Sequence, residues 1–147
     1  MLLIGVKNIN TQDVLTDGSI SIGSVYRKYC RKTFNGLPNF TATDTSLTLN
    51  GPGVYHVTAT FVGSGAAAGD VTVQMLVNGE AIPGALSTQT ITTPDTEIRT
   101  FVIDYYLLVD RVCLLGTDTT TSNVISFENT GVDATFTDVV VNVSKEV

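Results

Sequence analysis

The chain has 147 residues, a net charge of −6 and a charged fraction of 15%, which suits one domain with a core of its own. An acidic chain does not attract a phosphate backbone, so we expect no nucleic-acid partner. The mean hydropathy is +0.25, but no apolar run approaches the roughly 18 residues that span a bilayer, so we expect no membrane partner. The apolar residues must then lie in a large core or, as the low charge favours, partly in a subunit interface.

The chain divides into a short N-terminal segment and one main domain. Residues 1–18 are expected to form either a first strand or an extension that reaches out of the domain and attaches it to a partner. The first residues turn polar too soon for a signal peptide. The main domain is expected over residues 19–147, because the turn-forming pair Asp17-Gly18 precedes a series of strand-like segments.

Half of the Lys and Arg residues lie in one short run, in contrast to the acidic character of the whole chain. These residues are Arg27, Lys28, Arg31 and Lys32. One interpretation is a solvated strand edge, because lysines at an edge discourage aggregation. The other is a contact with an acidic partner, and the sequence leaves both interpretations open.

Alternation of apolar and polar residues with period two is clear at residues 53–61. The face that we expect to be dry consists of Tyr55, Val57, Ala59 and Phe61. Similar runs rich in Thr and Val, separated by Gly, Asn and Asp, predict about eight to ten strands along the chain. The polar tract at residues 117–122 is expected to be a loop. The pattern therefore predicts an all-β sandwich or barrel.

The clearest local signal is the pair Asn78-Gly79 between two apolar runs. This pair predicts a β-hairpin with a type I′ turn, because both central residues of that turn need positive φ angles. Pro83 follows in the return strand and cannot donate a hydrogen bond to a neighbouring strand. We therefore expect that strand to bulge at the proline or to lie at a sheet edge.

Residues 100–109 break the alternation, because both faces of this expected strand are apolar. A strand of this kind is covered on both faces. The second cover would be another subunit or, alternatively, a loop of the same chain. On the first interpretation, the residues expected at the subunit interface are Phe101, Ile103, Tyr105, Tyr106 and Leu108.

Candidate reactive groups are sparse, and we expect no catalytic residue, no cofactor and no metal site. His56 is the only histidine, so any Ser-His-Asp set would depend on it alone. Cys30 and Cys113 are the only cysteines, and neither lies in a CxxC pair. They could form a disulfide, but two buried free thiols are at least as consistent with the sequence. We therefore expect the protein not to be an enzyme.

Two segments resemble a known group of jelly-roll domains. Residues 47–59 (LTLNGPGVYHVTA) and 73–84 (VQMLVNGEAIPG) resemble the G-x-Y-x-V/F strand and the strand ending in NG of C1q/TNF-like domains. The return after the NG pair is similar to bacteriophage head-fibre and decoration proteins and to the C-terminal domains of exosporium filaments. Residues 20–27 resemble the lead-in strand of the phage group. The resemblance spans residues 19–145 and implies a two-sheet antiparallel jelly-roll sandwich.

The resemblance also implies an assembly and a biological setting. Members of this fold usually form homotrimers with apolar inner strands. The implied function is that of a structural virion protein, a capsid decoration or head-fibre domain on the capsid surface, assembled in the host cytoplasm. Its partner would be the major capsid protein or a fibre base, and direct attachment is expected because the chain has no collagen-like Gly-X-Y stalk.

Two alternatives to this setting stay open from the sequence. The first is a carbohydrate- or receptor-binding module of a phage fibre, whose glycan contacts would rest on Tyr26, Tyr29 or Tyr106. The second is a domain of a bacterial surface or exosporium filament. Both alternatives keep the expected fold and change only the partner.

Overall fold

The computed structural model describes residues 2–29, 33–34, 37–114, 117–120 and 123–146. These residues form sixteen β-strands and no helix. In chain order the strands are β1 (Leu2–Asn8), β2 (Gln12–Val14), β3 (Gly18–Ser19), β4 (Ser24–Tyr29), β5 (Thr33–Phe34), β6 (Leu37–Pro38), β7 (Phe40–Ala42), β8 (Ser46–Leu49), β9 (Gly53–Gly65), β10 (Gly69–Val77), β11 (Glu80–Ile91), β12 (Arg99–Val109), β13 (Arg111–Leu114), β14 (Thr117–Thr120), β15 (Asn123–Asn129) and β16 (Ala134–Lys145). The number exceeds the predicted eight to ten because several connections contain strands of only two to four residues.

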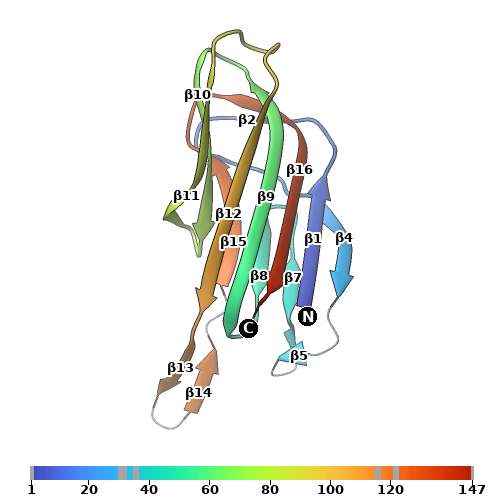
Figure 1. Cartoon of the computed structure of the whole chain (residues 1–147), viewed down its shortest axis with the longest axis vertical. Coiled ribbons are helices and arrows are strands. Elements are labelled where there is room, and N and C mark those ends of the chain that lie inside the picture. The colour runs from blue at the N-terminus through green and yellow to red at the C-terminus, as the bar shows by residue number, and fades with distance from the viewer. Residues whose placement is uncertain (1, 30–32, 35–36, 115–116, 121–122, 147) are drawn as a thin grey trace.

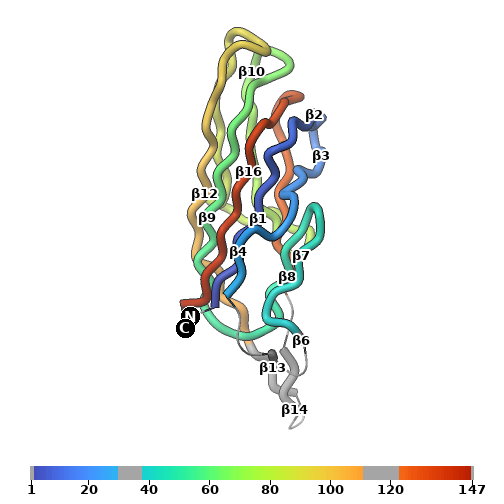
Figure 2. The backbone as a smooth tube through the Cα atoms, turned by 90° about the vertical axis from the view of Figure 1, so that its right-hand side faces the viewer, coloured from blue at the N-terminus to red at the C-terminus, as the bar shows by residue number. Residues whose placement is uncertain are grey.

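The strands form two antiparallel sheets that pack face to face (Figure 2). The first sheet has the order β12-β9-β16-β1-β4, with β2 beside β16 (Figure 1). The second has the order β11-β10-β15-β8-β7, with β3 beside β15. The short hairpins β5–β6 and β13–β14 are separate from both sheets. The predicted two-sheet antiparallel sandwich is confirmed.

The core lies between the sheets and follows the period-two pattern of the sequence. The predicted dry face of β9 is fully buried, with no exposed area on Tyr55, Val57, Ala59 or Phe61. Successive side chains of a strand point to opposite faces, so only one side of each sheet meets the other sheet. Rings from β9, β12, β15 and β16 meet edge to face at the centre, with centroids 5.1 to 6.2 Å apart; these are Phe61, Phe101, Phe127 and Phe136.

The predicted hairpin joins β10 to β11. Asn78 and Gly79 have φ angles of 53° and 81°, as a type I′ turn requires. The pairing of β10 with β11 shifts register between Gln74 and Leu76, and β11 is the edge strand of its sheet. Both expectations for the strand that contains Pro83 are therefore confirmed.

The N-terminal segment is part of the first sheet. Strand β1 lies between β16 and β4, and it buries Ile4 and Val6 in the core. Strand β2 pairs with the other end of β16. This placement corresponds to the first-strand alternative for residues 1–18.

The tract expected to be a loop is partly a strand, which corrects that expectation. Thr117–Thr120 form β14 and pair with β13. Threonine is β-branched and suits an extended backbone, and the pairing gives the backbone groups partners. The tract is polar on both faces, so period-two alternation could not reveal it as a strand.

Candidate functional site

Strand β12 lies at one edge of the first sheet, and its side chains alternate between the core and solvent. Phe101 and Ile103 point into the core with exposed fractions of 0% and 2%, and Tyr105 is half-buried against it. Tyr106 and Leu108 are exposed by 61% and 60%. Of the five residues expected at a subunit interface, Phe101 and Ile103 thus belong to the core of their own chain.

The outer face of β12 is apolar and uncovered. Val102 is 53% exposed and shares this face with Tyr106 and Leu108. No segment in the described part of the chain lies over these three side chains. Among the described residues, no loop of the same chain therefore covers this apolar face.

The one carboxylate on the outer face of β12 is paired. His56 on β9 donates from Nε2 to Oδ1 of Asp104 over 2.5 Å. The imidazole lies flat on the ring of Tyr106, with centroids 4.5 Å apart and an interplanar angle of 9°. The stacking and the hydrogen bond together hold Tyr106 and Asp104 in fixed positions on the sheet surface. The sequence placed His56 on the wetter face of its strand but gave no sign of its two partners, because they belong to a distant strand.

A second tyrosine lies toward the opposite edge of the same sheet face. Tyr26 on β4 donates from its hydroxyl to Oδ1 of Asn142 over 2.6 Å. Its ring lies over Gly5 of β1, and Nζ of Lys7 is 5.2 Å from the ring centroid. The outer face of the first sheet therefore carries a positioned aromatic ring near each edge.

Two residues of the basic run lie on the edge strand β4. Arg27 and Lys28 are exposed, and as neighbours in a strand they point to opposite faces. Arg31 and Lys32 lie outside the described residues, as does Cys30. The side chain of Cys113 is also outside the described part, so the structure does not bear on a bond between the two cysteines.

Among the described residues, no three His, Cys, Asp or Glu side chains gather closely enough to hold a metal ion. Within the same residues, no helix is long and apolar enough to cross a membrane.

Comparison with solved structures decides the fold. The globular domain of zebrafish complement 1qA matches over 100% of this chain and 98% of its own, with a TM-score of 0.64 at 9% identity. Eiger TNF from S. frugiperda matches over 100% and 94%, with a TM-score of 0.68 at 12% identity. The fold is a C1q/TNF-like jelly roll. At such identities the likeness concerns the fold alone.

A vertex protein is also similar in fold. PRD1 vertex protein P5 matches over 98% of this chain and 96% of its own, with a TM-score of 0.55 at 10% identity. No protein-family model and no curated protein matches the chain.

Proposed function

We propose that this protein is a non-enzymatic structural component of a phage virion. It acts as a capsid decoration or head-fibre domain, and it sits on the capsid surface as a homotrimer. The observation that carries the proposal is the uncovered apolar face of β12, with Val102, Tyr106 and Leu108 exposed. Large apolar side chains exposed together on one face of a folded domain favour a surface that binds another protein.

The composition of this face favours a second copy of the chain as the partner. Subunit interfaces are rich in aromatic and aliphatic side chains and poor in charge at their centre. Asp104 is the one carboxylate among the outward residues of β12, and it is already paired with His56. The C1q/TNF-like jelly roll, whose members usually assemble as trimers, supports three copies packed through this sheet.

The proposed virion setting is supported by a sequence resemblance and by a shared fold. The sequence resembles phage head-fibre and decoration domains, and PRD1 vertex protein P5 shares the fold. Attachment to an acidic capsid or fibre base is assigned to the basic edge of β4, where Arg27 and Lys28 are exposed. The apolar face of β12 lies at the opposite end of the sheet order, so the two contacts use separate strands.

The trimer is tested by light scattering on the purified chain at micromolar concentration. We expect a trimer, and we expect Leu108→Glu and Tyr106→Glu to shift it to monomer because each places a charge in the buried interface. Leu86→Glu is the matched control, since Leu86 is an exposed leucine on β11 of the other sheet. A stable wild-type monomer would overturn the trimer.

Attachment is tested by sedimenting the chain with undecorated phage heads at low salt. The wild-type chain is expected to co-sediment, and Arg27→Glu combined with Lys28→Glu is expected to abolish binding. The sedimentation assay and the scattering assay report on different surfaces. If the wild-type chain binds none of the phage heads, the virion role is contradicted, whereas the proposed trimer is not affected.

A further inference from the structure

The only histidine of the chain lies beside the surface that the proposed trimer would bury. His56 on β9 is the cross-strand partner of Tyr106 on β12. Its ring stacks on the Tyr106 ring, with centroids 4.5 Å apart. Tyr106 is 61% exposed and belongs to the apolar outer face of β12. A second copy that covers Tyr106 would therefore cover the neighbouring imidazole as well.

The imidazole is bonded to a carboxylate that is open to solvent in the single chain. Nε2 of His56 lies 2.5 Å from Oδ1 of Asp104. The exposed fractions of these side chains are 28% for His56 and 61% for Asp104. Asp104 precedes Tyr106 by two residues, so both side chains point to the same face of the sheet. The pair therefore lies within the surface that a second copy would cover, and its charge would lose water there.

The other charged group on this side of His56 is a second carboxylate. Strand β9 has no other charged residue. On β16, Ser144 is opposite His56, and its hydroxyl donates to Oε1 of Glu146 over 2.6 Å. Lys145 lies between these two residues in the chain and points to the opposite side, toward a buried ring of β9. The strands on either side of β9 thus place Asp104 and Glu146, both acidic, around the imidazole.

Protonation of His56 changes the charge that the proposed interface would bury. With a neutral imidazole, each chain brings the negative charges of both Asp104 and Glu146 to this region. With a charged imidazole, the charge of Asp104 is balanced within the pair. Unbalanced charges cost most, and like charges repel most strongly, where water is removed. Copies should therefore associate more readily when His56 is protonated, and association then takes up protons.

We propose that His56 makes the assembly of this protein sensitive to pH, with the trimer favoured in mildly acidic solution. The inference rests on the proposed trimer through the outer face of β12. Histidine ordinarily gains its proton between about pH 8 and pH 5, whereas carboxylates ordinarily keep their charge above about pH 5. Since His56 is the only histidine, no other side chain ordinarily changes its charge in this range. The trimer should therefore strengthen as the pH falls from about 7.5 to about 5.5.

The test is sedimentation equilibrium of the full chain at about pH 7.5 and about pH 5.5, at constant salt. We expect the wild-type trimer to dissociate at a concentration about tenfold lower at the acidic pH, because hydrogen bonds to charged groups are stronger than neutral ones by roughly this factor in an equilibrium constant. His56→Gln should show no such difference, because its amide can still donate to Asp104 but gains no charge. Asp104→Asn should also lose the difference, because a charged imidazole would then be buried without its carboxylate.

Glu80→Gln is the matched control for a general effect of charge, since Glu80 lies at the exposed start of β11 in the other sheet. This variant should keep the pH difference. A wild-type trimer of equal strength at both pH values would overturn the pH sensitivity but not the trimer, as would a His56→Gln trimer that still strengthens in acid. A wild-type chain that is monomeric at both pH values would overturn the trimer and the pH sensitivity together. Folding of each variant is checked by its circular dichroism spectrum.

Discussion

The ring of Tyr26 covers Gly5 so closely that a Cβ atom at residue 5 would lie 2.7 Å from Cε1 of the tyrosine. The same Cβ would lie 2.6 Å from Oδ1 of Asn142, which is the atom that accepts the Tyr26 hydroxyl. Real Cβ atoms do not approach other heavy atoms this closely. Glycine at this position of β1 is therefore what allows the tyrosine to lie flat on the sheet.

Gly5→Ala is expected to displace the Tyr26 ring and to break its bond to Asn142. The cost should be about 1–3 kcal/mol, as for other overpacked sites, measured by urea unfolding. In a Tyr26→Ala background the same substitution should cost less, because the ring no longer occupies the space. An equal loss of stability in both backgrounds would show that the ring is not the obstacle.

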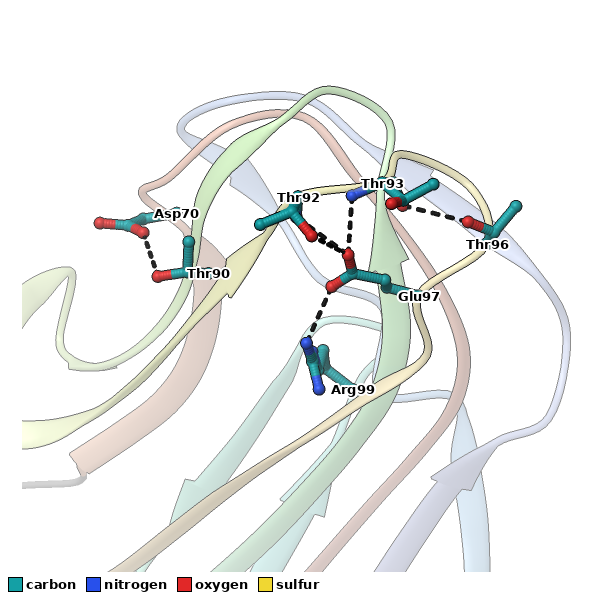
Figure 3. A network of polar contacts seen from close by, with 7 residues as sticks. All are labelled: Asp70, Thr90, Thr92, Thr93, Thr96, Glu97 and Arg99. Atoms are coloured by element: carbon teal, nitrogen blue, oxygen red, sulfur yellow. Dashed lines mark hydrogen bonds and ion pairs between the residues drawn. The ribbon is translucent and has the colours of Figure 1, made fainter.

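The loop between β11 and β12 is closed by one carboxylate (Figure 3). Oε1 of Glu97 accepts hydrogen bonds from the Thr92 hydroxyl and from the backbone N–H of Thr93 over 2.7 Å. Its Oε2 accepts from Arg99 over 2.8 Å. These bonds, that from the Thr92 hydroxyl above all, lower the pKa of Glu97 from 4.5 to about 2.

This shift predicts a pH dependence of stability. The pKa of Glu97 is lower in the folded state, so its contribution is complete above pH 4.5 and is lost as the pH falls toward about 2. Glu97→Gln should lower the melting temperature at neutral pH and flatten the loss between pH 4.5 and about 2. Glu80→Gln removes the same charge from the exposed start of β11 and serves as the control. An unchanged acid profile in Glu97→Gln would contradict the role of the loop.

The cluster of four rings in the core should dominate the stability of the sandwich. Phe61 has no exposed area and packs against Phe127 and Phe136 at 5.1 and 6.2 Å. Phe61→Ala is expected to lower the free energy of unfolding by about 3–5 kcal/mol, measured by urea unfolding. Leu86→Ala on the exposed side of β11 should stay within about 0.5 kcal/mol. A small loss at Phe61 would mean that the core rearranges to fill the space.

Two glycines should respond differently to the same substitution. Gly79 has a φ angle of 81°, and nothing lies within 4 Å of an added Cβ, so Gly79→Ala should cost about 1–2 kcal/mol from the backbone alone. At Gly63 an added Cβ would lie 2.3 Å from the Thr135 carbonyl oxygen. Gly63→Ala should therefore cost more, because two backbones would have to separate. Equal melting temperatures for the two variants would contradict this distinction.

Local patterns in the sequence predicted much of the sandwich. The alternation at Tyr55, Val57 and Ala59 identified a buried face, because the pleat of a strand sends every second side chain to the same side. The Asn78-Gly79 pair identified the hairpin, because few residues accept the φ angles of its turn. Each of these features depends only on residues that are close together in the chain, so each could be predicted without the tertiary structure.

The candidate sites could be predicted only in part. The sequence predicted Tyr106 and Leu108 at a subunit interface, but it predicted Phe101 and Ile103 at the same interface. Both faces of β12 are apolar in sequence, and only the register of its pairing with β9 decides which face meets the core. The partners of His56 lie on β12, at a register that only the pairing of the two strands defines.

A pocket opens at the end of β1, and the sequence did not predict it. Lys7, Ser21 and Asp44 come from three segments without a shared motif, and hydrogen bonds between those segments bring them together. What the sequence by itself determined was the extended backbone, the buried face of β9 and the position of its tightest turn. The tertiary structure decided which apolar side chains stay outside and which polar ones converge, since both depend on pairings between strands far apart in the chain.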